Sequence, residues 1–190
     1  MFKELVVKNR SYRRFKENYF IDKEVLKELL DYARLANSAS NRQPLKYMLS
    51  NQEKENDKVF ASLSWAGYLE DWPGPEPGER PSAYIIMLGD TTITNKFYAD
   101  PGIACAYIML GAVEKGLGGC IFAAINHKKL RKQLAVPEQY EILYVLALGK
   151  PVEAVKLESV GEEGDIKYWR DQDQVHHVPK RGLVEIILND

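Results

Sequence analysis

The chain has 190 residues, of which 45% are hydrophobic and 28% are charged, and its formal net charge is −1. This size and composition are typical of a single globular domain that spans residues 1–190 and buries a sizeable core. The near-neutral charge and the lack of a long basic run argue against nucleic acid as a partner. The opening residues, MFKELVVKNR, contain no apolar signal region, and no apolar stretch is long enough to span a bilayer. We therefore expect a cytoplasmic protein with no membrane association.

The first quarter of the chain predicts two helices separated by an extended segment. Residues 2–8 are weakly helical, and residues 10–15 are expected to form an extended segment or a loop. A second helix is expected to begin after Asp22, which is a favourable N-cap, because apolar residues then recur at helical spacing as far as Asn37. The polar stretch that leads to Pro44 predicts a loop.

The middle of the chain predicts a buried strand and a long central helix. Residues 54–63 predict a helix, and the continuous apolar run at 82–88 predicts a strand that is buried on both faces. An almost wholly apolar helix is expected over residues 100–115, with Asp100 as its N-cap. Residues 65–81 are rich in tryptophan, proline and glycine. They predict a long loop that either covers the core or forms a wall over a ligand.

The last third predicts strands over residues 120–124 and 142–148, joined by a short basic helix. Residues 152–167 are polar and are expected to be irregular, whereas residues 168–178 are expected to be extended. The β-branched run at 183–188 is compatible with either a helix or a strand. The order of elements therefore predicts an α+β fold with one sheet and long central helices.

The cysteines and histidines do not predict a disulfide, a catalytic thiol or a metal site. Cys105 and Cys120 lie in apolar stretches, which favours two buried free thiols. His176 and His177 are adjacent on a segment that is expected to be extended, so their side chains would point to opposite faces. The third histidine, His127, lies beside two lysines and is expected at the surface. We expect no bound metal.

A cluster of cations follows the first helix. Arg10 and Arg13 flank Ser11, and two guanidinium groups with a hydroxyl can form charge-assisted hydrogen bonds to a phosphate. Taken alone, the same residues are more typical of a solvated surface segment. A second basic pair, Lys180 and Arg181, near the end of the chain could complete an anion site or could also be solvated.

The loop before Pro44 carries uncharged hydrogen-bonding side chains. Asn41 and Gln43 each offer a donor and an acceptor on one amide, which matches the alternating edge of a flavin pyrimidine ring, and Ser38 lies nearby. Taken alone, this composition is also common in ordinary turns. A third segment, the glycine-rich stretch at 116–124, would let its backbone approach a ligand closely.

Read together, these segments resemble the FMN-dependent nitroreductase family. Members typically open with Arg-Arg-Ser-x-Arg-x-Phe, and residues 9–15 of this chain read NRSYRRF. After a helix, members show Pro-Ser-x-x-Asn-x-Gln-Pro-Trp, and residues 37–45 read NSASNRQPL. The long central helix, the Gly-x-Gly-x-Cys strand, the Leu-Gly-x-Pro strand end and a closing basic pair recur in the same order. Asn9 and Leu45 depart from the pattern at a first arginine and at the tryptophan.

The resemblance implies a nitroreductase-like fold with a mixed or antiparallel central sheet flanked by helices. It also implies a homodimer that exchanges its C-terminal segments and binds FMN at the subunit interface. The implied activity is an NADH- or NADPH-dependent oxidoreductase that reduces nitroaromatics, quinones or a related small oxidant by ping-pong hydride transfer through flavin N5. No side chain is then needed as a catalytic acid or base, because the cofactor carries the chemistry.

The resemblance also implies the cofactor-binding residues. The N-terminal arginines and serine would meet the phosphate and the ribityl-pyrimidine end, and the polar loop would lie near the ring. The backbone at 123–124 would approach N5, and the closing basic pair would help to hold the phosphate. The expected set is Arg10, Ser11, Arg13, Ser38, Asn41, Gln43, Ala123, Ala124, Lys180 and Arg181.

Two alternatives stay open at this point. One is a flavin-binding protein without turnover that acts as a redox sensor or scavenging module. The other is a related reductive reaction on one dedicated substrate, such as dehalogenation or flavin breakdown.

Overall fold

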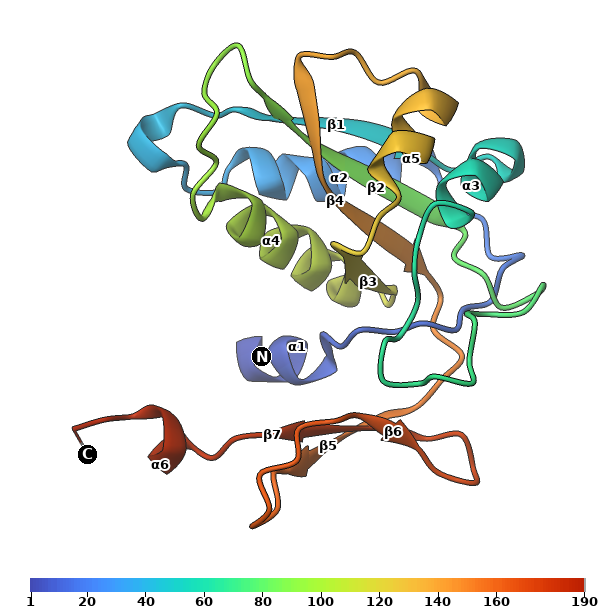
Figure 1. The fold of residues 1–190 in the computed structure, drawn as a ribbon, viewed down its shortest axis with the longest axis vertical. Coiled ribbons are helices and arrows are strands. Elements are labelled where there is room, and N and C mark those ends of the chain that lie inside the picture. Colours follow the sequence, from blue (N-terminus) through green and yellow to red (C-terminus); the bar gives the residue numbers. More distant parts are fainter. Residues whose placement is uncertain (190) are drawn as a thin grey trace.

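Two sheets organise the chain, a central one covered by helices on both faces and a smaller one built from the C-terminal residues (Figure 1). The computed structural model describes residues 1–189. The elements in chain order are α1 (Phe2–Lys8), α2 (Lys23–Arg34), η1 (Ala39–Asn41), β1 (Leu45–Ser50), α3 (Glu53–Phe60), β2 (Ala83–Asp90), α4 (Asp100–Glu114), β3 (Gly118–Phe122), α5 (His127–Leu134), β4 (Tyr140–Gly149), β5 (Val155–Ser159), β6 (Trp169–Arg170), β7 (His176–Lys180) and α6 (Leu183–Ile186).

The central sheet has the strand order β1-β2-β4-β3, and every neighbouring pair is antiparallel. All residues of β2 are buried, which confirms the prediction from its continuous apolar run. Ile85 and Met87 face α2 and α4, whereas Tyr84 and Ile86 face α3 and α5. The two faces alternate because successive side chains on a strand point in opposite directions. The result is a helix–sheet–helix sandwich with one core on each side of the sheet.

Helix α4 lies along the central sheet, as its apolar composition predicted. The prediction that Asp100 caps this helix is wrong, because the N-cap position is Ala99 and Asp100 is already helical. The carboxylate of Asp100 is instead buried and turned towards the loop at 38–43. At the other end Gly116 adopts a φ of +69°, a left-handed conformation that ends a helix without the steric cost of a Cβ atom.

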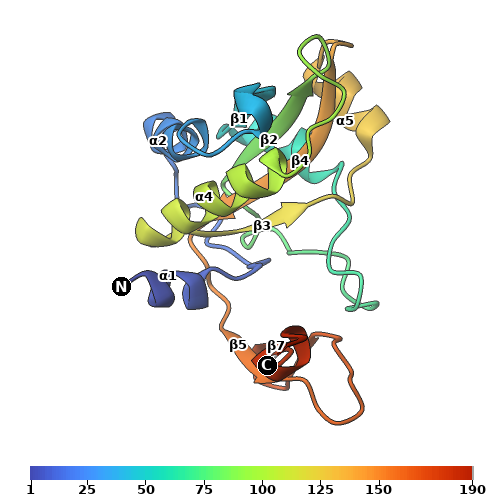
Figure 2. The same ribbon diagram turned by 90° about the vertical axis from the view of Figure 1, so that its left-hand side faces the viewer.

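The C-terminal residues form a second sheet of order β5-β7-β6, and the prediction of a single sheet is therefore wrong. Strand β5 lies inside the stretch at 152–167 that was expected to be irregular. Its partner β7 runs parallel to it, with Val155 opposite His176, so the pairing joins residues about twenty positions apart and leaves no local pattern. The stretch at 183–188 resolves into the short helix α6. Figure 2 shows this unit below α1, set apart from the main body.

The C-terminal unit contacts the N-terminal segment of its own chain. Beyond β7 its apolar side chains are left exposed, with Leu183 71%, Val184 80% and Leu188 98% accessible. Exchange of this segment between subunits stays a prediction. Within residues 1–189 no helix is both long enough and apolar enough to cross a membrane.

The long loop at 65–81 packs against the core. The ring of Trp65 lies 4.6 Å from that of Phe122 and 6.2 Å from that of Trp72. Farther along the loop, Tyr68 lies 4.9 Å from Tyr168 of the C-terminal unit. The loop therefore covers one core and also reaches the second sheet.

Both cysteines are buried free thiols, as predicted. Burial raises the pKa of Cys105 to about 12 and also raises that of Cys120. Neither sulfur is therefore activated as a thiolate.

Candidate functional site

The segment that follows α1 is held against β3 through its backbone. The N–H of Tyr12 donates to the carbonyl of Gly119 at 2.9 Å, and Ser11 forms an isolated parallel bridge with the same glycine. A Cβ atom at Gly119 would collide with the carbonyl oxygen of Ala147 on β4. Farther along, Phe15 is fully buried. The cationic segment therefore has a fixed position over the glycine-rich strand.

Arg10 has a donor that is buried and unpaired. Its Nη2 donates to the carbonyl of Val6 at 2.7 Å, but its Nε has no hydrogen-bond partner within residues 1–189. Buried donors are nearly always satisfied in folded proteins, so an orphaned guanidinium donor marks a place for an acceptor from outside the chain. An anionic oxygen, such as a phosphate oxygen, fits this donor.

Arg13 is 9% exposed, and the C-terminal unit covers its guanidinium. Its Nη1 donates to the carbonyl of Ser11 at 3.2 Å and lies 3.1 Å from Nε2 of His176, while the ring of Tyr168 lies 4.7 Å from its central carbon. A guanidinium only donates, so Nε2 of His176 must accept and the neutral ring carries its proton on Nδ1. Burial, followed by the charges of Arg13 and Arg170, lowers the pKa of His176 to about 4. The cation at Arg13 is thus fixed beside a neutral imidazole.

A buried carboxylate organises this group. Oε1 of Glu153 accepts the backbone N–H groups of Arg13 and Arg14, the second at 3.2 Å. Its Oε2 accepts from Nη2 of Arg170 at 3.0 Å. The guanidinium of Arg170 lies 4.2 Å from the ring centre of Trp72. One carboxylate therefore ties together the cationic segment, the C-terminal unit and the loop at 65–81.

Sequence reasoning missed Glu153, Tyr168, Arg170 and His176 as members of this group. Glu153 and Tyr168 lie at or beside a stretch that was expected to be irregular. His176 was considered only as a metal ligand and set aside. Glu153, Tyr168 and His176 contact Arg13, which lies more than a hundred residues earlier, so no local spacing could have identified them. The one usable sign was an acidic residue two positions after the proline of the Leu-Gly-x-Pro strand end.

The loop at 38–43 is a second polar group, anchored by Asp100. Oδ2 of Asp100 accepts from the hydroxyl of Ser38 at 2.6 Å, and Oδ1 accepts from the N–H of Ala39 at 2.9 Å. The Ser38 hydroxyl in turn accepts the N–H of Gln43 at 2.9 Å, and the Gln43 amide donates to the side chain of Asn41 at 3.1 Å. Ser40, Asn41 and Gln43 all have positive φ. Ser38 and Gln43 border a cavity of about 180 Å³.

Two groups of polar residues lie apart within one chain. The first is the cationic segment at 10–15 with its contacts from the C-terminal unit, and the second is the loop at 38–43. The loop at 38–43 contacts the first residue of α4, whereas the bridge between Ser11 and Gly119 lies beyond its last turn. A helix of 15 residues is roughly 22 Å long at 1.5 Å per residue. Figure 1 shows the same separation, with η1 at the opposite end of α4 from the segment after α1.

The remaining residues of the expected cofactor-binding set lie at several other places in the fold. Ala123 and Ala124 follow β3 directly and are exposed, and the carbonyl of Ala124 accepts from Ser64 at 3.0 Å. Lys180 ends β7 and lies roughly 13 Å along the strand from His176. Arg181 is exposed and forms an ion pair with Glu185 at 3.2 Å. The closing basic pair therefore shares no contact with Arg13 in this chain.

Comparison with known proteins gives consistent matches. The sequence model of the Nitroreductase family matches residues 6–150, which include the cationic segment and the loop at 38–43 but neither Glu153 nor the second sheet. A Thermotoga neapolitana protein named iodotyrosine deiodinase is 22% identical over 170 residues, which cover 80% of this chain and 89% of that protein. A nitroreductase family protein from Clostridium difficile 630 superposes with a TM-score of 0.67 at 22% identity, and the match covers 98% of this chain and 96% of that one. An FMN-dependent nitroreductase from Clostridium difficile R20291 gives a TM-score of 0.63 at 22% identity, with 78% and 86% covered.

The family match covers most of the chain and includes each local motif of the two polar groups. The structural matches show that the fold is that of nitroreductase proteins. This chain belongs to the nitroreductase family.

Proposed function

We propose that the chain is an FMN-dependent oxidoreductase that uses NADH or NADPH to reduce nitroaromatics, quinones or a related small oxidant. Membership of the nitroreductase family supports the general class. One structural relative, the FMN-dependent nitroreductase from Clostridium difficile R20291, supports the cofactor. When bound, FMN would supply the redox chemistry of the reaction.

The observation that carries the proposal is the unpaired donor of Arg10 over the glycine-rich strand. Within the described residues, its Nε is buried and lacks a partner, so this position suits a phosphate oxygen. Ser11 lies next to it and can add a hydroxyl. Arg13 would place a fixed positive charge near the part of the cofactor that becomes negative on reduction, and Glu153 holds its backbone. The proposed work of these residues is to bind and orient, and no side chain needs to transfer a proton.

We further propose that the enzyme is a homodimer in which one cofactor meets both polar groups. Roughly a helix length separates these groups within one chain, so Ser38, Asn41 and Gln43 would come from the partner subunit. The exposed apolar residues of 183–188 support an extensive contact with a second chain. Lys180 and Arg181 would reach the phosphate only if this segment is rearranged or exchanged.

The test begins with the absorbance of the purified protein and the identity of the flavin that it releases on denaturation. We expect FMN, bleaching on anaerobic addition of NADH or NADPH, and recovery of colour with a quinone or a nitroaromatic. Arg10→Ala should reduce FMN retention, whereas Arg34→Ala, at an exposed residue of α2 that pairs with Asp31, should not. Protein that stays colourless after reconstitution with FMN would reject the proposal.

A second candidate function is reductive dehalogenation, which is favoured by the Thermotoga neapolitana relative named iodotyrosine deiodinase. The same preparation should be assayed for iodide release from 3-iodotyrosine with a chemical reductant. Iodide release faster than quinone or nitroaromatic reduction would favour this candidate. Flavin binding with no turnover of any of these oxidants would instead favour a redox sensor or scavenging module.

A further inference from the structure

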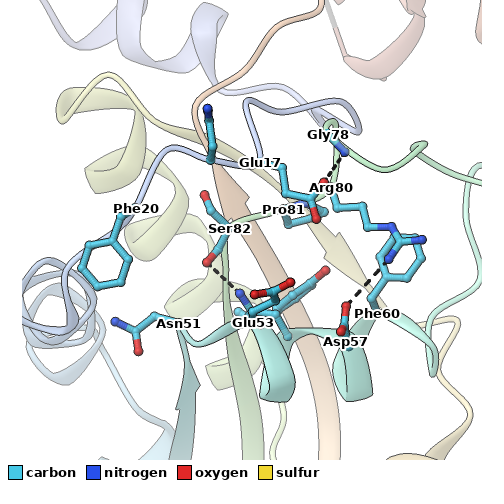
Figure 3. Close-up of a pocket in the computed structure, with 13 residues that line it drawn as sticks. Glu17, Phe20, Asn51, Glu53, Asp57, Phe60, Gly78, Arg80, Pro81 and Ser82 are labelled. Carbon is cyan, nitrogen blue, oxygen red and sulfur yellow. Dashed lines mark hydrogen bonds and ion pairs between the residues drawn. The ribbon is translucent and has the colours of Figure 1, made fainter.

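A cavity of about 550 Å³ lies away from both polar groups described above. It is lined by the loop at 17–20, residues 51–60 with helix α3, and residues 78–84, which lead into β2. Figure 3 shows side chains from these three segments around it. None of the ten predicted cofactor-binding residues borders this cavity, so it is a separate feature of the fold.

Two buried hydroxyls in the cavity wall lack partners. Tyr84 is 0% exposed and Ser82 is 7% exposed, and both residues are among those that line the cavity. In the described part of the chain, neither hydroxyl has a hydrogen-bond partner. Burial raises the pKa of Tyr84 well above its usual range, so its phenol stays protonated and can both donate and accept. Because buried polar groups are normally satisfied, these hydroxyls point to a polar ligand.

Carboxylates outnumber cations around the cavity. Glu17, Glu53 and Asp57 border it, and Arg80 is the one lining residue of positive charge in the described chain. Nη1 of Arg80 lies 3.7 Å from Asp57, and its guanidinium is stacked 4.4 Å from the ring centre of Phe60. Figure 3 shows this pair at one side of the cavity. The remaining carboxylates give the cavity a net negative character.

The apolar part of the wall comes from two aromatic rings. Phe20 and Phe60 both border the cavity, and Phe20 is 62% exposed. A ligand that displaces water from these rings must have a hydrocarbon portion. The wall therefore suits a ligand that has a positive charge, a hydrogen-bonding end and a short apolar stem.

We propose that this cavity binds a small aliphatic amine or guanidine cation. One cationic end would meet Glu53 and Asp57 at the rim, and a polar end would reach the hydroxyls of Ser82 and Tyr84. The methylene groups between these ends would lie against the aromatic rings. This site is independent of the proposed flavin site, because it shares no residue with the predicted cofactor-binding set.

The test is calorimetric titration of the full-length protein with agmatine, which carries a guanidinium at one end and an ammonium at the other. The matched ligand is 1,4-butanediol, which has the same four-methylene stem and a hydrogen-bonding hydroxyl at each end but carries no charge. We expect saturable binding of agmatine that weakens with added salt, and much weaker binding of the matched ligand. Absence of saturable agmatine binding up to about 10 mM, or equal binding of both ligands, would overturn the proposal.

Variants locate the binding to this cavity. Tyr84→Phe removes one hydroxyl and should weaken agmatine binding about tenfold. Glu53→Gln combined with Asp57→Asn should also weaken agmatine binding about tenfold, and it should reduce the dependence of that binding on salt. Glu55→Gln, an exposed change on the same helix outside the cavity, is the matched control. Tyr84→Phe should fold as well as the wild type, because the hydroxyl that it removes is unpaired. Unchanged affinity in both test variants, with folding confirmed by circular dichroism, would also overturn the proposal.

Discussion

Glu153 and Arg170 form an ion pair that is shut off from solvent, with Oε2 and Nη2 3.0 Å apart and the two side chains 0% and 8% exposed. The other carboxylate oxygen accepts backbone N–H groups from Arg13 and Arg14. The buried charge on Glu153 needs all of these hydrogen bonds, because burying a charge without compensating partners costs free energy. The pair is therefore the junction that fixes the cationic segment on the C-terminal unit.

Glu153→Gln should lower the free energy of unfolding by about 3–5 kcal/mol, because it leaves Arg170 charged and buried without its counter-ion. Urea denaturation measures this change. Glu24→Gln breaks an exposed pair with Lys27 and should cost less than about 1 kcal/mol. Equal effects of the two substitutions would show that burial does not determine the strength of the Glu153 pair.

The two adjacent histidines should titrate in opposite directions. The pKa of His176 is lowered to about 4 by burial and by the charges of Arg13 and Arg170. The pKa of His177 is raised from 6.5 because its two ring nitrogens lie 3.0 Å from Asp171 and 2.8 Å from Glu158. Separate NMR titration of the two imidazoles checks both directions. A single shared transition near 6.5 would contradict them.

These shifts predict how stability depends on pH. His176 binds its proton less readily in the folded state, so its contribution is full above about 6.5 and is lost as the pH falls towards about 4. His177 binds its proton more readily when folded, so its contribution is full below about 6.5 and is lost as the pH rises through its raised pKa. Urea denaturation across this range should show a smaller acid loss in His176→Asn than in the wild type. An unchanged acid limb would exclude His176 as its source.

Gly119→Ala and Gly102→Ala should change stability with opposite signs. At Gly119 the added methyl group meets a backbone carbonyl of the neighbouring strand, which cannot move aside easily, so we expect a loss of about 1–3 kcal/mol. At Gly102, within α4, the methyl group meets no atom of the described chain within 4 Å. Alanine there should stabilise by about 0.5–1 kcal/mol because it restricts the unfolded chain. Thermal unfolding of both variants provides the measurement, and losses of equal size would refute the steric argument.

Asp100→Ala should loosen the loop at 38–43. The substitution removes the acceptors of the Ser38 hydroxyl and the Ala39 N–H, and we expect a loss of about 1–3 kcal/mol. Hydrogen exchange of the Ala39 amide should become faster by more than the change in global stability explains. Asp31→Ala, which removes an exposed helix pair, is the control and should leave that amide unchanged. An Ala39 amide that keeps its protection would show that Asp100 does not anchor the loop.

The buried strand, the central helix and the family could all be predicted from local patterns in the sequence. The apolar run at 82–88, the helix that follows residue 100 and the glycine at 116 act through near neighbours, so their patterns are readable along the chain. The motifs at 9–15 and 37–45 are likewise local, and together they indicated the nitroreductase family that the comparison shows.

The residues that surround those motifs could be identified only in the folded chain. Pairing of β5 with β7, the bond from Asp100 to the loop at 38–43 and the contacts of Glu153 with Arg13 join residues far apart in the chain. Such contacts depend on which surfaces the folded chain brings together, and local propensity carries no record of them. For the same reason the sequence could place Arg10 and Asn41 in one predicted site, whereas the structure puts the length of α4 between their two segments.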